Sequence, residues 1–217
     1  MEPMIIINFK TYASGTGKEG LELAKLCKKV NSKIIVAAQA TDIAAISKLG
    51  VPVFAQHIGS APQGKFTGHI TAEAVAQAGA IGTLINHAEK KMPVDSISQA
   101  VTRAKENKLL TIVCAASINE AREIALNCDP DYIAVEPPGL IGGKVSVANA
   151  KPEIITKTIE QVHKIKNVPI ICGAGIQNSE DVKTAMKLGA SGVLVANCIM
   201  GAKDKEEALH QLVDGVI

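Results

Sequence analysis

The stretch YIAVEPPGLIGGK, residues 132–144, joins a short apolar run to a single carboxylate and two prolines. The apolar run is typical of a buried parallel strand, and Glu136 follows where that strand would end. Each proline ring fixes its own φ angle, and the first ring also restricts Glu136. Gly142 and Gly143, near the end of the stretch, can absorb dihedral changes or present N–H groups to an anion. The stretch therefore indicates either a catalytic base beneath a hinged lid or a solvated glutamate in an ordinary loop.

Outward from this stretch, the chain changes eight times from a β-branched apolar run to an amphipathic helical pattern. The predicted strands are 4–8, 34–39, 51–56, 81–86, 109–115, 132–136, 169–173 and 192–196. The predicted helices are 18–30, 43–49, 72–78, 94–107, 119–126, 152–165, 179–188 and 203–213. An open doubly wound sheet usually has fewer strands and a glycine-rich turn after the first strand, which this chain lacks. We therefore predict an α/β fold, a single (β/α)8 barrel in a compact version with short helices.

The composition limits the classes of function. The 23 Lys and Arg residues and 21 Asp and Glu residues are spread along the chain, and the formal net charge is +2. This balance argues against nucleic acid or a membrane surface as the main partner. Aromatic residues make up 2% of the chain and Trp is absent, so stacking platforms for bases are lacking. No linker-like change in composition occurs, and we expect one catalytic domain over residues 1–217.

The cysteines indicate buried free thiols and a reducing compartment. Their number is odd, and they lack the close spacing of a zinc or redox motif. Cys172 falls at a predicted strand end, but no His or cationic residue lies nearby in the sequence to activate it. The apolar run at the N-terminus is too short for a signal peptide, and no later run approaches membrane-spanning length. We expect a cytoplasmic protein without a metal or cofactor.

Polar residues at the predicted strand ends are the candidates for chemistry, because active sites of such barrels lie at the carboxyl ends of the strands. Asn8 and Lys10 follow the first strand, His87 and Glu89 the fourth, and Glu136 the sixth. A base, an imidazole and a cation at one mouth suit an anionic substrate. Asn8 either ties loops together or positions the lysine or the substrate. We expect Glu89 to hold Lys10 or a loop.

The last two predicted strands end in small residues, which let backbone amides approach a ligand closely. Gly173-Ala174-Gly175 follows the seventh strand and Ala196-Asn197 the eighth. Phosphate groups are commonly bound at this place in barrels. The alternative is that these glycines serve only the geometry of the turn.

These residues resemble the triosephosphate isomerase family, in its shortened archaeal form. The matching motifs are NFKTY at 8–12, GKFTGH at 64–69, NHAE at 86–89, EPPGLIG at 136–142 and CGAG at 172–175. They occur in family order from the first strand to the last. The resemblance implies interconversion of dihydroxyacetone phosphate and D-glyceraldehyde 3-phosphate through an enediol or enediolate.

The resemblance also implies a role for individual residues. Glu136 would be the base, His87 the electrophile and Lys10 the cation near the substrate oxygens, oriented by Asn8. Thr67, at the tip of the third loop, would reach into the site of a neighbouring subunit, which implies a homo-oligomer, with a tetramer favoured over a dimer. The residues expected to line the phosphate pocket are Ile141, Gly142, Gly175, Ala196 and Asn197.

Three positions depart from the family pattern. Ala88 stands where serine is common, Gly139 where archaeal relatives often have glutamate, and Asn197 where glycine or serine is usual. None of them falls on the three residues assigned to the chemistry. Two other functions remain open: another phosphosugar-processing barrel enzyme, or a barrel that binds a phosphometabolite without turnover. An aldolase would need a Schiff-base lysine, which the sixth and seventh predicted strands lack.

Overall fold

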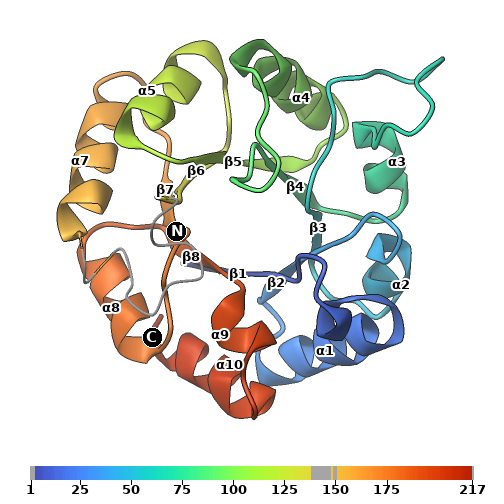
Figure 1. The fold of residues 1–217 in the computed structure, drawn as a ribbon, viewed down its shortest axis with the longest axis vertical. Helices are drawn as coiled ribbons and strands as arrows, with labels where there is room; N and C mark the ends of the chain where they lie inside the picture. Colours follow the sequence, from blue (N-terminus) through green and yellow to red (C-terminus); the bar gives the residue numbers. More distant parts are fainter. Residues whose placement is uncertain (1–2, 138–147, 149–150, 217) are drawn as a thin grey trace.

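The computed structural model describes residues 3–137, 148 and 151–216, which form eight strands in a closed parallel barrel. Each strand pairs with the next, and pairing of β8 with β1, from Met4↔Gly192 to Ile7↔Val195, closes the ring (Figure 1). The predicted barrel is therefore confirmed. The strands are β1 Met4–Asn8, β2 Ile35–Ala38, β3 Val53–Ala55, β4 Gly82–Ile85, β5 Leu110–Ala115, β6 Tyr132–Val135, β7 Ile170–Cys172 and β8 Gly192–Val195.

Helices surround the barrel, and their ends differ from the predicted ones by no more than 2 residues. Two short helices, η1 and α9, were not predicted, because a helix of 3 or 4 residues is too short to show an amphipathic period. The described helices are η1 Ala13–Gly15, α1 Gly17–Val30, α2 Ile43–Lys48, α3 Ala72–Gln77, α4 Val94–Glu106, α5 Ile118–Asn127, α7 Pro152–His163, α8 Ser179–Lys187, α9 Asn197–Met200 and α10 Lys205–Asp214.

Polar side chains begin several of these helices. Ser117 accepts a hydrogen bond from Glu120 N at 3.1 Å, and Asn178 accepts one from Asp181 N at 3.1 Å. Asp42 directly precedes α2 but does not cap it, because its carboxylate accepts a hydrogen bond from Gly17 N, at the start of α1, at 2.9 Å. These bonds satisfy N–H groups at the starts of the helices that cover the barrel.

Two separate apolar clusters hold the barrel. Successive residues of a strand point to opposite faces, so that Ile6 fills the interior while Ile5 and Ile7 pack against the helices. Phe54 is fully buried inside the barrel. A Cβ atom at Gly82 would lie 2.4 Å from Phe54 Cζ, so glycine leaves the space that this ring occupies.

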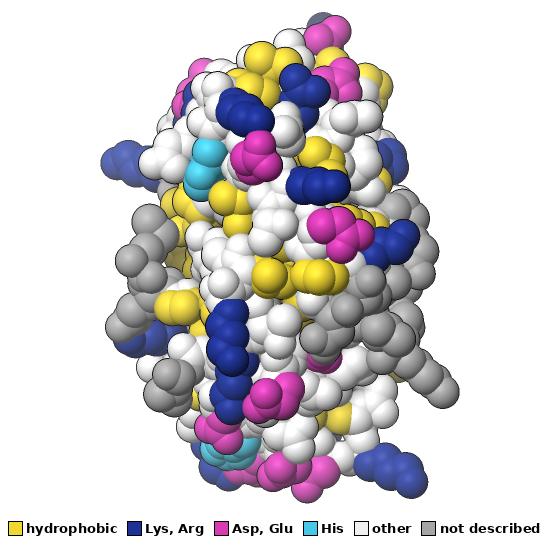
Figure 2. All heavy atoms as spheres, turned by 90° about the vertical axis from the view of Figure 1, so that its left-hand side faces the viewer, with side chains coloured by type: hydrophobic (Ala, Val, Ile, Leu, Met, Phe, Trp, Pro, Cys, Tyr) yellow, Lys and Arg dark blue, Asp and Glu magenta, His cyan; other side chains and the backbone are white. Residues whose placement is uncertain are grey.

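The face of the molecule in Figure 2 carries charges of both signs, and the cysteine thiols are buried or partly buried. Lys and Arg side chains alternate with Asp and Glu on the face that Figure 2 shows, and no patch of one sign forms there. The five cysteines are free, and burial raises the pKa of Cys27, Cys172 and Cys198 to about 12. Such thiols are inert near neutral pH, as predicted for Cys172. Among the described residues, no helix combines the length and apolarity that crossing a membrane requires.

Candidate active site

The alternation of side chains along the strands aims the candidate residues into the barrel mouth. Ile6, Ala134, Ile171 and Leu194 face the barrel interior. The residues two positions later, which share that face, are Asn8, Glu136, Gly173 and Ala196. All four line one cavity of about 50 Å³ at the carboxyl ends of the strands. Strand parity therefore brings these four residues together, whereas His87 follows Ile85, which packs against the helices, and reaches the same cavity through the left-handed turn at Asn86.

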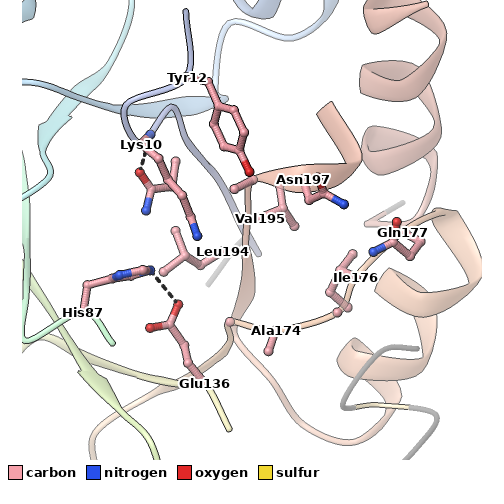
Figure 3. Close-up of a pocket in the computed structure, with 14 residues that line it drawn as sticks. Lys10, Tyr12, His87, Glu136, Ala174, Ile176, Gln177, Leu194, Val195 and Asn197 are labelled. Atoms are coloured by element: carbon pink, nitrogen blue, oxygen red, sulfur yellow. Dashed lines mark hydrogen bonds and ion pairs between the residues drawn. The ribbon is translucent and has the colours of Figure 1, made fainter. Parts of the chain in front are cut away.

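Lys10, His87 and Glu136 point toward one another in this cavity (Figure 3). His87 Nε2 lies 3.5 Å from Glu136 Oε1. Lys10 Nζ donates to Glu89 Oε1 at 2.6 Å, which is the contact expected for Glu89. An imidazole, a carboxylate and an ammonium from three distant parts of the chain thus share one small space.

Glu136 is buried in a way that favours proton transfer. Only 2% of its surface is exposed, and among the described residues its Oε2 atom has no hydrogen-bond partner. Burial raises the pKa of Glu136 from 4.5 to about 7, while Cys114 and Lys10 oppose this rise. A carboxylate with a pKa near 7 is a stronger base than a solvated one and still ionises near neutral pH.

His87 is held as a neutral imidazole. Its Nδ1 accepts a hydrogen bond from Glu89 N at 3.2 Å, so the ring proton lies on Nε2, which faces Glu136. Burial lowers the pKa of His87, and the charges of Lys10 and Lys91 add to the effect against that of Glu89. The ring can therefore donate an N–H to a ligand oxygen in the cavity that it shares with Glu136.

The loop after β1 fixes Lys10 through its backbone. Lys10 adopts a φ of 45°, in the left-handed region that side chains other than glycine rarely occupy. Asn8 Oδ1 accepts from Lys10 N at 2.9 Å, and Gln56 Nε2 donates to Lys10 O at 2.8 Å. Asn8 thus both ties this loop and positions the lysine, which joins the two roles considered for it.

The small residues after β7 and β8 form the other end of the cavity. Gly175, Ala196 and Asn197 line it, and the amide of Asn197 points away from the carboxylate and imidazole in Figure 3. A Cβ atom at Gly173 would lie 2.5 Å from Glu136 Cγ, so glycine here makes room for the carboxylate side chain. Ile141 and Gly142, the other predicted pocket residues, lie outside the described residues, as does Gly139.

A second cavity of about 230 Å³ lies on the other side of Lys10 and His87. Its wall includes Gln56, His57 and Lys90. The segment between β3 and α3, which carries Thr67, projects away from the barrel in Figure 1 and exposes this threonine. Thr67 is therefore absent from the described walls of these two cavities of its own chain.

Sequence reasoning assigned no function to three residues near the site. Tyr12 and Gln177 line the first cavity, and Cys114 lies in the barrel interior beside Glu136. Tyr12 stands two residues after Lys10 in the motif NFKTY, so its place in the sequence could have indicated that it lines the site. Cys114 faces inward near the end of a neighbouring strand, which only the strand pairing reveals. Among the described residues, no group of three His, Cys, Asp or Glu side chains is placed to hold a metal ion.

Comparison with known proteins gives the family. The family model described as triosephosphate isomerase matches residues 3–215. The triosephosphate isomerase of Methanocaldococcus jannaschii is 45% identical over 216 residues, covering 97% of this chain and 98% of the relative. The enzyme of Methanothermus fervidus is 43% identical over 217 residues, covering 97% of each chain.

A solved structure shows the same fold at much lower identity. The crystal structure of triosephosphate isomerase from Bartonella henselae superposes with a TM-score of 0.79 at 16% identity, and the match covers 99% of both chains. This structural likeness shows the fold, whereas the sequence matches above show the family. The chain described here belongs to the triosephosphate isomerase family, a family of isomerase enzymes.

Proposed function

We propose that the protein interconverts dihydroxyacetone phosphate and D-glyceraldehyde 3-phosphate, a reaction of glycolysis and gluconeogenesis. The observation that carries the proposal is the 3.5 Å approach of His87 Nε2 to Glu136 Oε1 beside Lys10 in one cavity. Family membership supports a phosphorylated triose as the substrate. An exchange of a carbonyl and a hydroxyl between neighbouring carbons needs one base and donors for the oxygens.

In the proposed mechanism one proton moves between two neighbouring carbons and a second proton moves between their oxygens. Glu136 takes a carbon-bound proton, and the electron pair of that C–H bond forms the double bond of an enediolate. The negative charge moves to the carbonyl oxygen, where His87 Nε2–H and the ammonium of Lys10 stabilise it. A proton then moves from the neighbouring hydroxyl oxygen to this former carbonyl oxygen, because His87 Nε2 gives its proton to one oxygen and takes the proton of the other. Glu136 returns its proton to the adjacent carbon, and the electron pair of the new oxyanion forms the new carbonyl group. No cofactor is required, because the substrate is oxidised at one carbon and reduced at the next.

The phosphate group would lie at the opposite end of the cavity. Gly175, Ala196 and Asn197 support this placement because they line that end. We propose that Ile141 and Gly142 complete the pocket. Binding energy from a group that does not react can hold the three-carbon end against Glu136 and His87, which raises the rate of the chemical step.

We also propose that one catalytic domain over residues 1–217 assembles into a homotetramer, with a homodimer as the alternative, in the cytoplasm. Thr67 would enter the cavity of about 230 Å³ beside Lys10 and His87 of a neighbouring subunit. The exposure of Thr67 and of Phe66, at 43%, supports this proposal. Sedimentation velocity separates a dimer from a tetramer, and a monomer would contradict the assembly.

An assay of glyceraldehyde 3-phosphate formation, coupled to its oxidation by an added dehydrogenase, tests the function. We expect the purified protein to turn over dihydroxyacetone phosphate, and Glu136→Gln to abolish turnover while inorganic phosphate still binds. Phosphate binding without turnover by the unmodified chain would favour the non-catalytic alternative. Full activity of Glu136→Gln would remove Glu136 as the base.

A further inference from the structure

We propose that Asn86 and Glu120 form a clamp that positions His87 and Glu136 relative to each other. The inference rests on the proposed function, because it assigns a catalytic consequence to the 3.5 Å distance between His87 Nε2 and Glu136 Oε1. Neither residue lines the cavity that contains the reacting groups. Their side chains meet instead in the space between the ends of β4 and β5, directly outside the site. Both would be positioning residues.

Asn86 holds the chain in an unfavourable conformation immediately before His87. Its φ is 60°, and it is fully buried. Its Nδ2 donates to Cys114 O at 2.9 Å and to Glu120 Oε1 at 2.8 Å, while its Oδ1 accepts from Met92 N at 2.9 Å. A left-handed residue costs free energy unless its surroundings fix it, and such residues cluster at functional sites. These three bonds stabilise the turn that aims the imidazole.

Glu120 completes the clamp from the first turn of α5. Its Oε2 accepts from Ala116 N at 2.7 Å, and its Oε1 accepts from Asn86 Nδ2 and from Lys91 Nζ. Burial alone would raise the pKa of Glu120, but the bonds from Lys91, Ala116 and Asn86 outweigh burial and lower it. The carboxylate is therefore ionised at neutral pH. In this state its two oxygens accept hydrogen bonds from all three donors, Asn86, Lys91 and Ala116.

The same bonds hold the end of β5, with which the backbone of Glu136 pairs. Cys114 O and Ala116 N are bound to the clamp, and between them Ala115 O accepts from Glu136 N at 2.8 Å. One side of the clamp thus fixes the residue before His87, and the other fixes the segment paired with Glu136. The clamp sets the 3.5 Å separation between the imidazole and the carboxylate through two short connections.

This arrangement predicts a loss in kcat rather than in binding. A displacement of about 1 Å between reacting groups can cost about 100-fold in rate. The cavity end assigned to phosphate is built from residues 173–177 and 194–197, and the described bonds of the clamp do not involve them. KM and phosphate affinity should therefore change little.

Asn86→Gly is the sharpest test. Glycine adopts a φ of 60° without strain, so the substitution removes the three side-chain bonds but keeps the backbone conformation accessible. We expect kcat to fall about 10- to 100-fold, with KM and inhibition by inorganic phosphate within about twofold of the unmodified protein. Glu120→Gln should act in the same direction, because Ala116 N and Asn86 Nδ2 bind different carboxylate oxygens, and the NH₂ group that replaces one of these oxygens cannot accept a hydrogen bond. It keeps the test valid if the glycine variant fails to fold.

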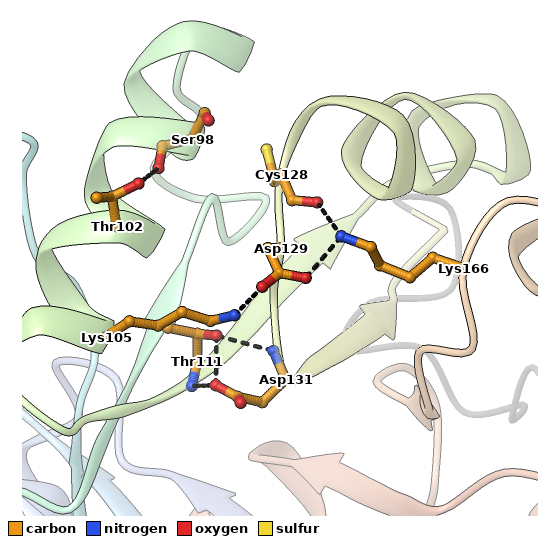
Figure 4. Close-up of polar contacts among 8 residues, drawn as sticks. All are labelled: Ser98, Thr102, Lys105, Thr111, Cys128, Asp129, Asp131 and Lys166. Atoms are coloured by element: carbon orange, nitrogen blue, oxygen red, sulfur yellow. Dashed lines mark hydrogen bonds and ion pairs between the residues drawn. The ribbon is translucent and has the colours of Figure 1, made fainter.

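Asp131→Asn is a matched control at the opposite end of the barrel (Figure 4). Asp131 Oδ2 accepts from Thr111 N and from Thr111 Oγ1, each at 2.8 Å, and so also links a carboxylate to a β5 backbone N–H. If the clamp bonds only stabilised the fold, the clamp variants and Asp131→Asn would all have lower melting temperatures and an unchanged kcat. We expect Asp131→Asn to keep its kcat, while both clamp variants lose theirs. Unchanged kcat in folded clamp variants would overturn the proposal.

The ¹⁵N resonances of the His87 ring separate this proposal from the proposed function. We expect Asn86→Gly and Glu120→Gln to shift these resonances and Asp131→Asn to leave them in place. If the unmodified protein does not isomerise the substrate, the proposed function fails, while shifted resonances still support the clamp. If it isomerises the substrate and the clamp variants keep both its kcat and its His87 resonances, the clamp fails alone.

Discussion

Glu136→Gln should stabilise the folded protein at alkaline pH while it removes activity. Burial raises the pKa of Glu136 from 4.5 to about 7, so the folded state disfavours the ionised carboxylate. Between these two values the folded chain holds more of this proton than the unfolded chain does, and stability falls as the pH rises. Glutamine cannot ionise and so avoids this loss. The proposed base thus weakens the fold that carries it.

The size of the effect follows from the two pKa values. One pH unit between the folded and the unfolded pKa corresponds to about 1.36 kcal/mol. A rise from 4.5 to about 7 therefore gives Glu136→Gln an advantage of about 3 kcal/mol at pH 8. The advantage falls to about 2 kcal/mol at pH 6 and to less than about 1 kcal/mol at pH 5. These values are upper limits, because the glutamine amide also needs hydrogen-bond partners.

Urea unfolding at a fixed protein concentration, repeated from pH 5 to pH 8, measures this difference. Asp129→Asn is a control of opposite sign, because hydrogen bonds from Lys105 and Lys166 lower the pKa of Asp129 to about 2. Its small destabilisation should be present at neutral pH and vanish as the pH falls toward 2. Equal stability changes for Glu136→Gln at pH 5 and pH 8, or a net destabilisation at pH 8, would refute the reasoning.

Three kinetic predictions follow from the same geometry. Lys10→Ala should lower kcat/KM about 10- to 100-fold, because it removes a charge-assisted donor and leaves Glu89 unpaired beside an anionic substrate; unchanged kinetics would make Lys10 a surface charge. His87→Ala should cost about 2.7 to 4 kcal/mol of transition-state stabilisation, and a loss below about 1 kcal/mol in kcat/KM would count against the electrophile role. Gly173→Ala places a Cβ atom 2.5 Å from Glu136 Cγ, so kcat should fall at least about tenfold with little change in KM, and wild-type kcat would show that the carboxylate is not displaced.

The barrel was predictable because its signals are local and repeated. Eight apolar runs between amphipathic stretches specify alternating strands and helices, and closed parallel barrels place residues at strand ends in one mouth. Asn8, Lys10, His87 and Glu136 were found in this way, and the structure brings them to one cavity. The sequence motifs added the family, which periodicity alone does not reveal.

The Asn86–Glu120 clamp and the position of Cys114 beside Glu136 could not be predicted in the same way. Asn86 and Glu120 are 34 residues apart, and their bond depends on how β4 and β5 align and on where α5 begins. Cys114 lies beside Glu136 because β5 pairs with β6 in the register that places Cys114 opposite Ala134. The pKa of Glu136 follows from the water excluded around it, which is a property of the packed structure.

Deuterium exchange tests the central claim, that Glu136 carries the proton between the two substrate carbons, most directly. The protein is incubated with dihydroxyacetone phosphate in D₂O, and NMR measures deuterium in the product at the carbon next to the new carbonyl group. We predict that the unmodified protein incorporates solvent deuterium there, because the proton held by a carboxylate can exchange before its return, and that Glu136→Gln incorporates none. Incorporation by Glu136→Gln at the rate of the unmodified protein would contradict the account.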